Sequence, residues 1–203
     1  MNVAQPVSER LLEMLARNKG RAVHVNELLG LGNRPRIAKA LSRLVTKGEI
    51  RRLGKGFYEY PRQSALLGGP ALQSPDALVQ AWAKKNKMRI IPTGAYAANL
   101  LGLSTQVPAK IVYCTNGKTK TVKLGPYTIR MMHRGPKTMD VQGGFFPLLL
   151  QALRYLGKKD VDEVMIKRIR TLLRPGYRKE IKAGFDYSPV WIKQVLVEIL
   201  KKD

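Results

Sequence analysis

The chain has 203 residues, of which 37 are Lys or Arg and 14 are Asp or Glu, and its formal net charge is +23. Such an excess of positive charge is typical of proteins that bind polyanions, nucleic acids above all. The hydrophobic content of 44% excludes a disordered basic tail and predicts a buried core. No apolar run approaches the roughly 20 residues of a membrane span, and the N-terminus lacks the apolar segment of a signal peptide, so a cytoplasmic location is expected.

The first 62 residues carry the pattern of a winged helix-turn-helix. An amphipathic helix is expected over residues 6–17, and Asn26 is expected to cap a short helix over 27–29. Residues 30–32 (GLG) predict a sharp turn, and a second helix is expected over residues 33–48, with Pro35 in its first turn and Gly48 at its end.

The second helix has an apolar side and a basic side. At 100° per residue, the apolar residues fall on one arc, and Arg36, Lys39 and Arg43 fall together on the opposite arc. Residues 50–53 and 57–60 then predict two strands joined by a tip at residues 54–56 (GKG), which would form the wing. The apolar arc carries Ile37, Leu41, Leu44 and Val45.

Glycine turn, basic helix and basic hairpin follow one another in the order of a DNA-binding module. A basic helix face can also be merely solvated, and small modules of this shape also dock onto proteins. We expect the start of the second helix to contact base edges and the wing to contact phosphates or the minor groove. The predicted DNA-binding residues are Asn33, Arg34, Arg36, Lys39, Arg43, Arg51, Arg52 and Lys55.

Residues 63–74 predict a linker, and residues 75–203 predict a second domain of α+β class with an antiparallel sheet and C-terminal helices. Helices are expected from Ser74-Pro75-Asp76 to about residue 87 and at 93–101, 141–156, 160–173, 177–183 and 190–201. Strands are expected at 89–91, 110–115, 119–124 and 127–133. Asn116-Gly117 predicts a hairpin between the strands at 110–115 and 119–124.

The middle of the chain is the most one-sided in charge, because residues 63–139 contain 11 basic residues and Asp76 as their only acid. Alternation places Lys123 on one face of the strand at 119–124 and Lys120 on the other. A second hypothesis is therefore an RNA-directed protein that uses this basic sheet. Its predicted phosphate contacts are Lys118, Lys120, Lys123 and Arg130.

Residues suited to catalysis are few, and we expect no enzyme, metal or cofactor. His24 and His133 share no metal-ligand spacing, and no nucleophile motif is present. Residues 160–163 form the single acid cluster, which is better explained by helix capping than by metal binding. Cys114, the only cysteine, is expected to be buried in a strand.

With these residues in view, the chain resembles the AbiEi family, the antitoxins of bacterial abortive-infection toxin–antitoxin systems. The resemblance is carried by residues 33–45 (NRPRIAKALSRLV), 48–58 (GEIRRLGKGFY) and 92–108 (PTGAYAANLLGLSTQVP), and it extends over nearly the whole chain.

The resemblance implies a winged helix that binds inverted repeats upstream of its operon and represses it, with two protomers on the DNA. It also implies a C-terminal domain that counteracts a nucleotidyltransferase-like toxin, without a requirement for direct contact between toxin and antitoxin.

Overall fold

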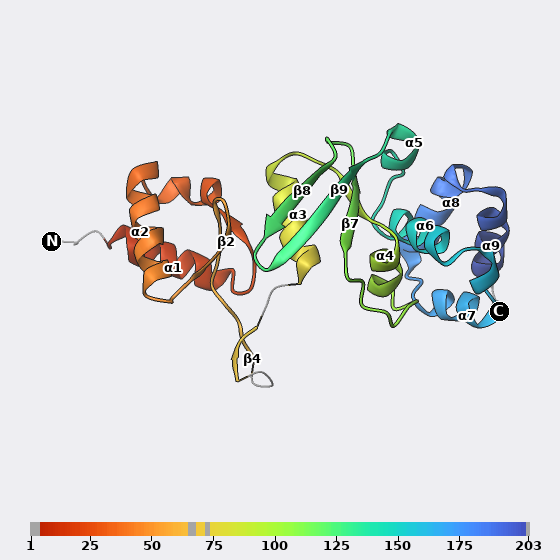
Figure 1. The fold of residues 1–203 in the computed structure, drawn as a ribbon, viewed down its shortest axis with the longest axis horizontal. Helices are drawn as coiled ribbons and strands as arrows, with labels where there is room; N and C mark the ends of the chain where they lie inside the picture. Colours follow the sequence, from red (N-terminus) through yellow and green to blue (C-terminus); the bar gives the residue numbers. More distant parts are fainter. Residues whose placement is uncertain (1–4, 65–67, 72–73, 202–203) are drawn as a thin grey trace. The chain divides into compact units, whose positions relative to one another are not determined.

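The structure is a computed structural model that describes residues 5–64, 68–71 and 74–201 (Figure 1). The chain forms two compact units, unit 1 (Met1–Lys87 with Lys123–Tyr127) and unit 2 (Met88–Val122 with Thr128–Asp203). Helices lie at both ends of the chain, and its sheets contain both antiparallel and parallel strand pairs. The expected α+β class is therefore confirmed. Within the described residues, no helix combines the length and apolar character needed to cross a bilayer.

Unit 1 begins with three helices around a small core. These are α1 (Val7–Arg17), the 3-10 helix η1 (Val25–Leu31) and α2 (Arg34–Thr46). Their apolar sides meet in a fully buried cluster, as the 3.6-residue periodicity predicts. The buried side chains at its centre are Leu11, Leu15, Leu28, Ile37 and Leu41.

The start of η1 differs from the sequence prediction. Asn26 does not cap this helix; His24 does, because its Nδ1 accepts the backbone N–H of Asn26 at 3.2 Å. The carboxylate of Glu27 accepts the backbone N–H of His24 at 2.9 Å, which completes a capping box. The prediction was wrong because a histidine is rarely an N-cap, whereas an asparagine often is one.

A three-stranded sheet completes the first part of unit 1. Strands β2 (Arg51–Gly54) and β3 (Phe57–Glu59) form the predicted hairpin, and β1 (Val23–His24) pairs with the other edge of β3. A strand of two residues is too short to produce an alternating pattern, so the sequence did not predict β1.

The predicted linker at residues 63–74 contains a short hairpin of β4 (Gln63–Ser64) and β5 (Gly69–Pro70), while residues 65–67 and 72–73 lie outside the described part of the chain. Helix α3 (Pro75–Lys85) follows, with the Ser74 hydroxyl as its N-cap. Because α3 packs against β1, it belongs to unit 1 and not to the second domain predicted to start at residue 75.

Unit 2 contains most of a four-stranded sheet in the order β6-β7-β9-β8, made of β6 (Ile90–Pro92), β7 (Ile111–Thr115), β9 (Tyr127–His133) and β8 (Lys120–Leu124). Strand β7 pairs antiparallel with β6 and parallel with β9, so the sheet is mixed, whereas an antiparallel sheet was expected. The Asn116-Gly117 hairpin is also wrong, because β9 lies between β7 and β8. Asn116 instead accepts the backbone N–H of Arg89 at 3.0 Å.

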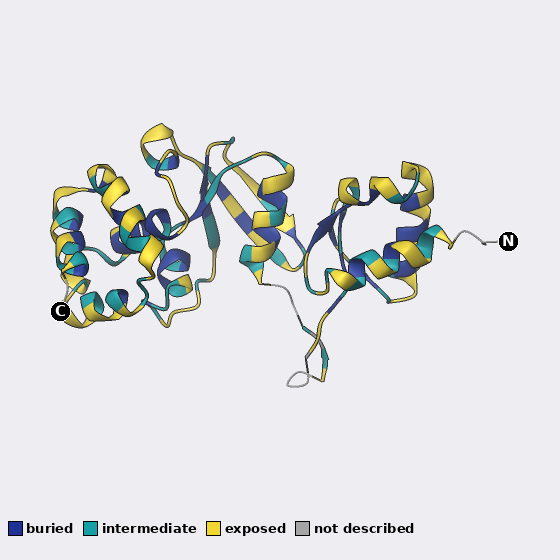
Figure 2. Cartoon of the chain, turned by 180° about the vertical axis from the view of Figure 1, so that it is seen from behind, coloured by how far each residue is buried: buried dark blue, intermediate teal, exposed yellow. Residues whose placement is uncertain are grey.

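Helices form the rest of unit 2 around a second core, whose buried residues line the inner faces of the helices (Figure 2). Helix α6 (Phe145–Leu156) is the most buried, and Pro147 lies in its first turn, where the missing N–H costs no hydrogen bond. The short α5 (Pro136–Met139) was not predicted. The remaining helical elements are α4 (Ala95–Leu100), η2 (Lys158–Asp160), α7 (Glu163–Thr171), α8 (Pro175–Gly184), η3 (Phe185–Tyr187) and α9 (Val190–Leu200).

Candidate nucleic-acid interface

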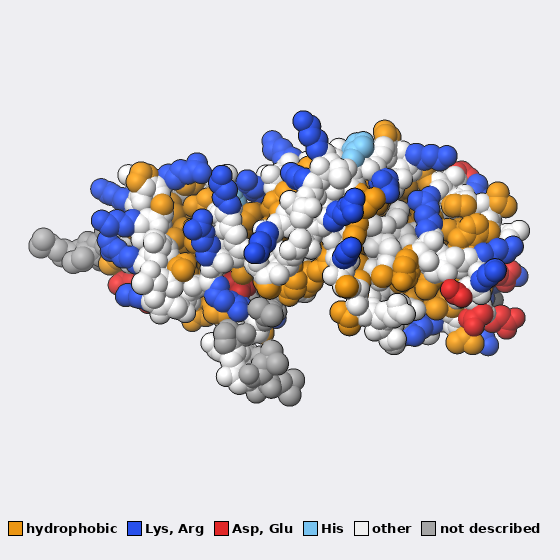
Figure 3. Space-filling model, in the orientation of Figure 1, with side chains coloured by type: hydrophobic (Ala, Val, Ile, Leu, Met, Phe, Trp, Pro, Cys, Tyr) orange, Lys and Arg blue, Asp and Glu red, His pale blue; other side chains and the backbone are white. Residues whose placement is uncertain are grey.

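Helix α2 separates its apolar and basic side chains as predicted. Ile37 and Leu41 are fully buried, whereas the basic residues of the helix are exposed. Lys and Arg side chains gather over α2 on the face shown in Figure 3. Positions 36, 39 and 43 are spaced by three and four residues, so their side chains follow one another along one side of the helix. The exposed basic residues are Arg34, Arg36, Lys39 and Arg43.

Asn33 has a structural role at the start of α2. Its Oδ1 accepts the backbone N–H of Arg36 at 3.1 Å and caps the N-terminus of α2. Recognition of adenine by asparagine needs both the oxygen and the amide nitrogen of the side chain. Because the oxygen is already bonded, Asn33 is poorly placed for adenine recognition and better suited to fixing the first turn, where Arg34 and Arg36 lie.

The β2–β3 hairpin adds two exposed cations next in sequence to α2. The turn is formed by Lys55 and Gly56, and Gly56 has φ +78°, a conformation that favours glycine. The backbone carbonyl of Gly56 accepts the N–H of Val25 at 2.8 Å, which ties the tip to the start of η1. Lys55 is therefore exposed on a turn that is held in place, and Arg52 is exposed on β2.

Arg51 is placed differently from the other predicted contacts. Its guanidinium forms an ion pair with Glu59, whose side chain is 1% exposed, and donates a hydrogen bond to the carbonyl of Ala71 at 2.5 Å. Arg51 and Glu59 are direct neighbours across the β2–β3 pairing. Arg51 is therefore not expected to contact DNA, because its charge is used inside unit 1.

The remaining cations form what we call the basic surface, defined as Arg34, Arg36, Lys39, Arg43, Arg52 and Lys55. Among the described residues, none of these side chains has a carboxylate within ion-pair distance. The nearby acids are bound elsewhere, Glu27 to Arg21 at 2.7 Å and Glu49 to Lys47 at 3.8 Å. The basic surface therefore has an uncompensated positive charge that a polyanion would neutralise.

His24 is a buried residue of unit 1. It is 7% exposed, and its ring lies edge-on to Phe57 with 4.8 Å between the ring centroids. Burial, and next the positive charge of Lys85, lowers the pKa of His24, while Glu27 acts in the opposite direction. The cap that it forms on η1 gives His24 a structural role.

The four cations predicted for the second domain are exposed, but they do not share one face. Burial alternates along β8 and β9, so Lys123 and Arg130 lie on the exposed face of these strands. Lys120 alternates along β8 with the same period as the more buried Val122 and Leu124, so it lies on the other face. Lys118 lies in the connection between β7 and β8.

The acidic, histidine and cysteine side chains considered for catalysis lie in caps, backbone contacts or the buried interior. Asp162 caps α7 through the backbone N–H of Met165 at 2.8 Å, and His133 Nδ1 lies 3.0 Å from the carbonyl of Gly117. Cys114 is buried, and this burial raises the pKa of its thiol. A hydrogen bond with Thr93 and the charges of nearby arginines lower the pKa by a smaller amount. The described residues contain no group of three or more His, Cys, Asp or Glu side chains placed to hold a metal ion.

Comparison with known proteins identifies a family whose function is unknown. No curated protein matches the chain. Among solved structures, the RV2827C protein from Mycobacterium tuberculosis aligns with 97% of this chain and 83% of its own, at 15% identity and a TM-score of 0.46. The family model described as "Family of unknown function (DUF6088)" matches residues 10–181. The chain therefore belongs to this family of unknown function, DUF6088.

Proposed function

We propose that residues 1–62 form a winged helix-turn-helix that binds duplex DNA, with α2 as the recognition helix and the β2–β3 hairpin as the wing. The observation that supports this most is the basic surface, whose exposed cations lie on these two elements and have no acidic partner among the described residues. Helix, turn, basic helix and hairpin follow one another here as they do in winged helix-turn-helix modules. In such modules the second helix lies in the major groove.

We infer different tasks for these side chains from their positions. Arg34 and Arg36 lie in the first turn of α2, the part of a recognition helix that reaches base edges, and arginine pairs with guanine O6 and N7. Lys39 and Arg43 continue along the side of α2 that carries Arg36. Arg52 and Lys55 contact phosphates or the minor groove, which sets the position of the protein without reading sequence.

Two matched variants test this division. Arg36→Ala is expected to cost about 1–3 kcal/mol on the preferred sequence and to relax preference at one base pair. Lys55→Ala is expected to weaken all duplexes about equally and to reduce the slope of log affinity against log salt by about 1. Lys179→Ala, an exposed lysine of α8, is the control. The proposal fails if the wild-type protein binds its own upstream DNA no more tightly than random duplex at near-physiological salt.

We further propose, from the resemblance to AbiEi antitoxins, that the protein represses its own operon and counteracts a nucleotidyltransferase-like toxin. Two protomers would occupy an inverted repeat, so analytical ultracentrifugation with upstream DNA should give two chains per duplex. Co-expression with the neighbouring toxin-like reading frame tests antitoxicity. If growth is not rescued when the protein is expressed, the antitoxin part of the proposal is wrong while the DNA-binding part stands on its own measurement.

A second candidate is RNA binding through the exposed face of β8 and β9, which Lys123 and Arg130 favour. Competition between upstream duplex DNA and a structured RNA separates the two functions. A clear preference for RNA that Lys123→Ala/Arg130→Ala abolishes and Arg36→Ala leaves intact would replace the repressor proposal with this one.

A further inference from the structure

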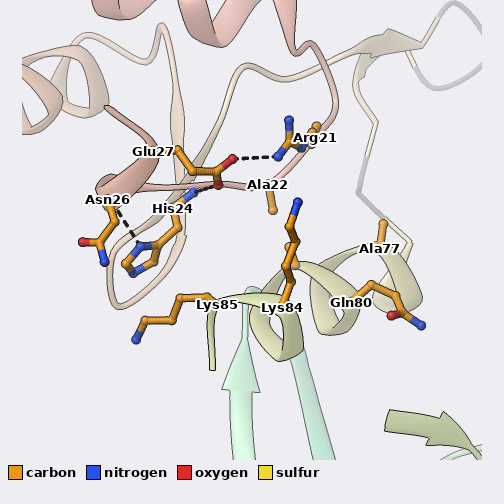
Figure 4. A pocket seen from close by; sticks show the side chains of 10 residues that line it. Arg21, Ala22, His24, Asn26, Glu27, Ala77, Gln80, Lys84 and Lys85 are labelled. Atoms are coloured by element: carbon orange, nitrogen blue, oxygen red, sulfur yellow. Dashed lines mark hydrogen bonds and ion pairs between the residues drawn. The ribbon is translucent and has the colours of Figure 1, made fainter. Parts of the chain in front are cut away.

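Unit 1 contains a cavity that the proposed DNA contacts do not use. It has a volume of about 730 Å³ and lies between residues 21–27 and helix α3 (Figure 4). Cavities that bind small molecules usually have volumes of about 300–1,000 Å³, so the space is large enough for a ligand of several rings or a sugar phosphate.

Small side chains make this space. The large apolar residues of α3, Leu78 and Trp82, are buried in the interior, and the face that borders the cavity carries Ala77 and Ala81 instead. Across the cavity lies Ala22, which is 3% exposed. The methyl groups of Ala77 and Ala81 provide an apolar surface, and the amides of Gln80 and Asn26 add polar groups to the lining.

The charged groups at the cavity are positive on balance. The guanidinium of Arg21 is 2.7 Å from Glu27 Oε2, and the other carboxylate oxygen of Glu27 accepts the N–H of His24 at 2.9 Å, so both oxygens of this acid are bound. Lys84 and Lys85 come from the last turn of α3, are exposed, and have no acidic partner in the part of the chain that the structure describes. Figure 4 shows both lysines beside the segment that carries Asn26 and His24.

We propose that this cavity is a binding site for a small phosphorylated molecule of about mononucleotide size. Its phosphate would lie at the ammonium groups of Lys84 and Lys85, with Arg21 held near by Glu27, and the face of its ring would lie on Ala77 and Ala81. Lysine ammonium groups bind phosphate as point charges. A hollow lined by alanines suits the body of a small molecule, whereas a duplex is contacted by side chains that protrude. The site is independent of the proposed DNA-binding function.

Isothermal titration calorimetry on the full chain tests the proposal with adenosine, AMP, GMP, CMP, UMP and ribose 5-phosphate at near-physiological salt. At least one of the four nucleotides should bind at one molecule per chain, and adenosine should bind far more weakly because it lacks the phosphate. Because the whole protein is basic, two pairs of variants separate the cavity from general charge.

The first pair changes charge equally at two places. Lys84→Gln/Lys85→Gln should weaken the nucleotide by about tenfold or more, whereas Lys158→Gln/Lys159→Gln, an exposed lysine pair in η2, should leave it unchanged. The second pair changes volume without charge. Ala81→Leu should fill the cavity and abolish binding, and Ala183→Leu on the exposed side of α8 should have no effect.

Several results would overturn the site. These are no binding of any of the four nucleotides, equal weakening by the two lysine pairs, or full nucleotide affinity in Ala81→Leu whose circular dichroism and Trp82 fluorescence match the wild type. Binding of duplex DNA that depends on Lys84 and Lys85, with no nucleotide binding, would assign these lysines to DNA phosphates and likewise refute a small-molecule site. None of these results decides whether α2 binds DNA, which the Arg36 and Lys55 variants measure separately.

Discussion

The ion pair between Arg51 and Glu59 gives the sharpest test of how unit 1 is built. The side chain of Glu59 is 1% exposed and that of Arg51 is 28% exposed, so the pair is largely withdrawn from water. Burial raises the pKa of Glu59, while the charge and hydrogen bonding of Arg51 lower it. Removing Arg51 therefore removes both effects that favour the ionised carboxylate.

The perturbation is Arg51→Met, which keeps an apolar stem and removes the charge. Breaking one side of a buried ion pair typically costs about 3–5 kcal/mol, because the remaining charge is left without a partner. A carboxyl whose pKa is higher in the folded than in the unfolded state destabilises the fold as pH rises through its folded pKa. The cost should thus be smallest below the ordinary pKa of a glutamate, where Glu59 is protonated in both states, and should approach the full value at about pH 8.

Urea unfolding from about pH 4 to about pH 8 measures this cost through changes in the free energy of unfolding. Trp82 is in unit 1 and Trp191 in unit 2, so a Trp191→Phe background makes tryptophan fluorescence report unit 1. The double variant Arg51→Met/Glu59→Leu should recover most of the loss and remove its pH dependence. A cost that does not change with pH would refute the reasoning, as would a loss of DNA sequence preference in Arg51→Met at unchanged stability.

Three further predictions concern other parts of the chain. Asn33→Ala should cost about 1 kcal/mol of unfolding free energy because it removes the cap of α2, which urea unfolding measures. Asn33→Asp should keep the cap and weaken DNA binding through charge repulsion, which fluorescence anisotropy measures. Equal DNA affinity in both variants would contradict the placement of this end of α2 at the DNA. Cys114 is buried and the pKa of its thiol is raised, so a disulfide reagent should label it only as fast as unit 2 opens; rapid labelling of the native protein would argue against its burial. Glu180 accepts the backbone N–H groups of Phe145 at 2.9 Å and Phe146 at 3.1 Å, so Glu180→Ala should lower the stability of unit 2 by about 1–2 kcal/mol; Trp191 fluorescence in urea would show this, and an unchanged midpoint would count against the contact.

The local features of this protein were predictable from its sequence. The apolar spacing of α1, α2 and α6 predicted where these helices lie, and Asn33 and Ser74 correctly marked the N-termini of α2 and α3. The glycines around Lys55 predicted the β2–β3 hairpin. These features depend on residues within a few positions of one another, because helix periodicity, capping and tight turns are short-range properties of the backbone.

The tertiary structure decided the features that depend on distant residues. Strand β9 lies between β7 and β8, so the Asn116-Gly117 dipeptide joins strands that are not neighbours. Glu59 removes Arg51 from the basic surface, and α3 brings Lys84 to the same cavity as Arg21, 63 positions earlier in the chain. Which strands pair, which charges meet and which small side chains leave a hollow are determined by how whole faces pack together, and no local pattern of residue types contains that information.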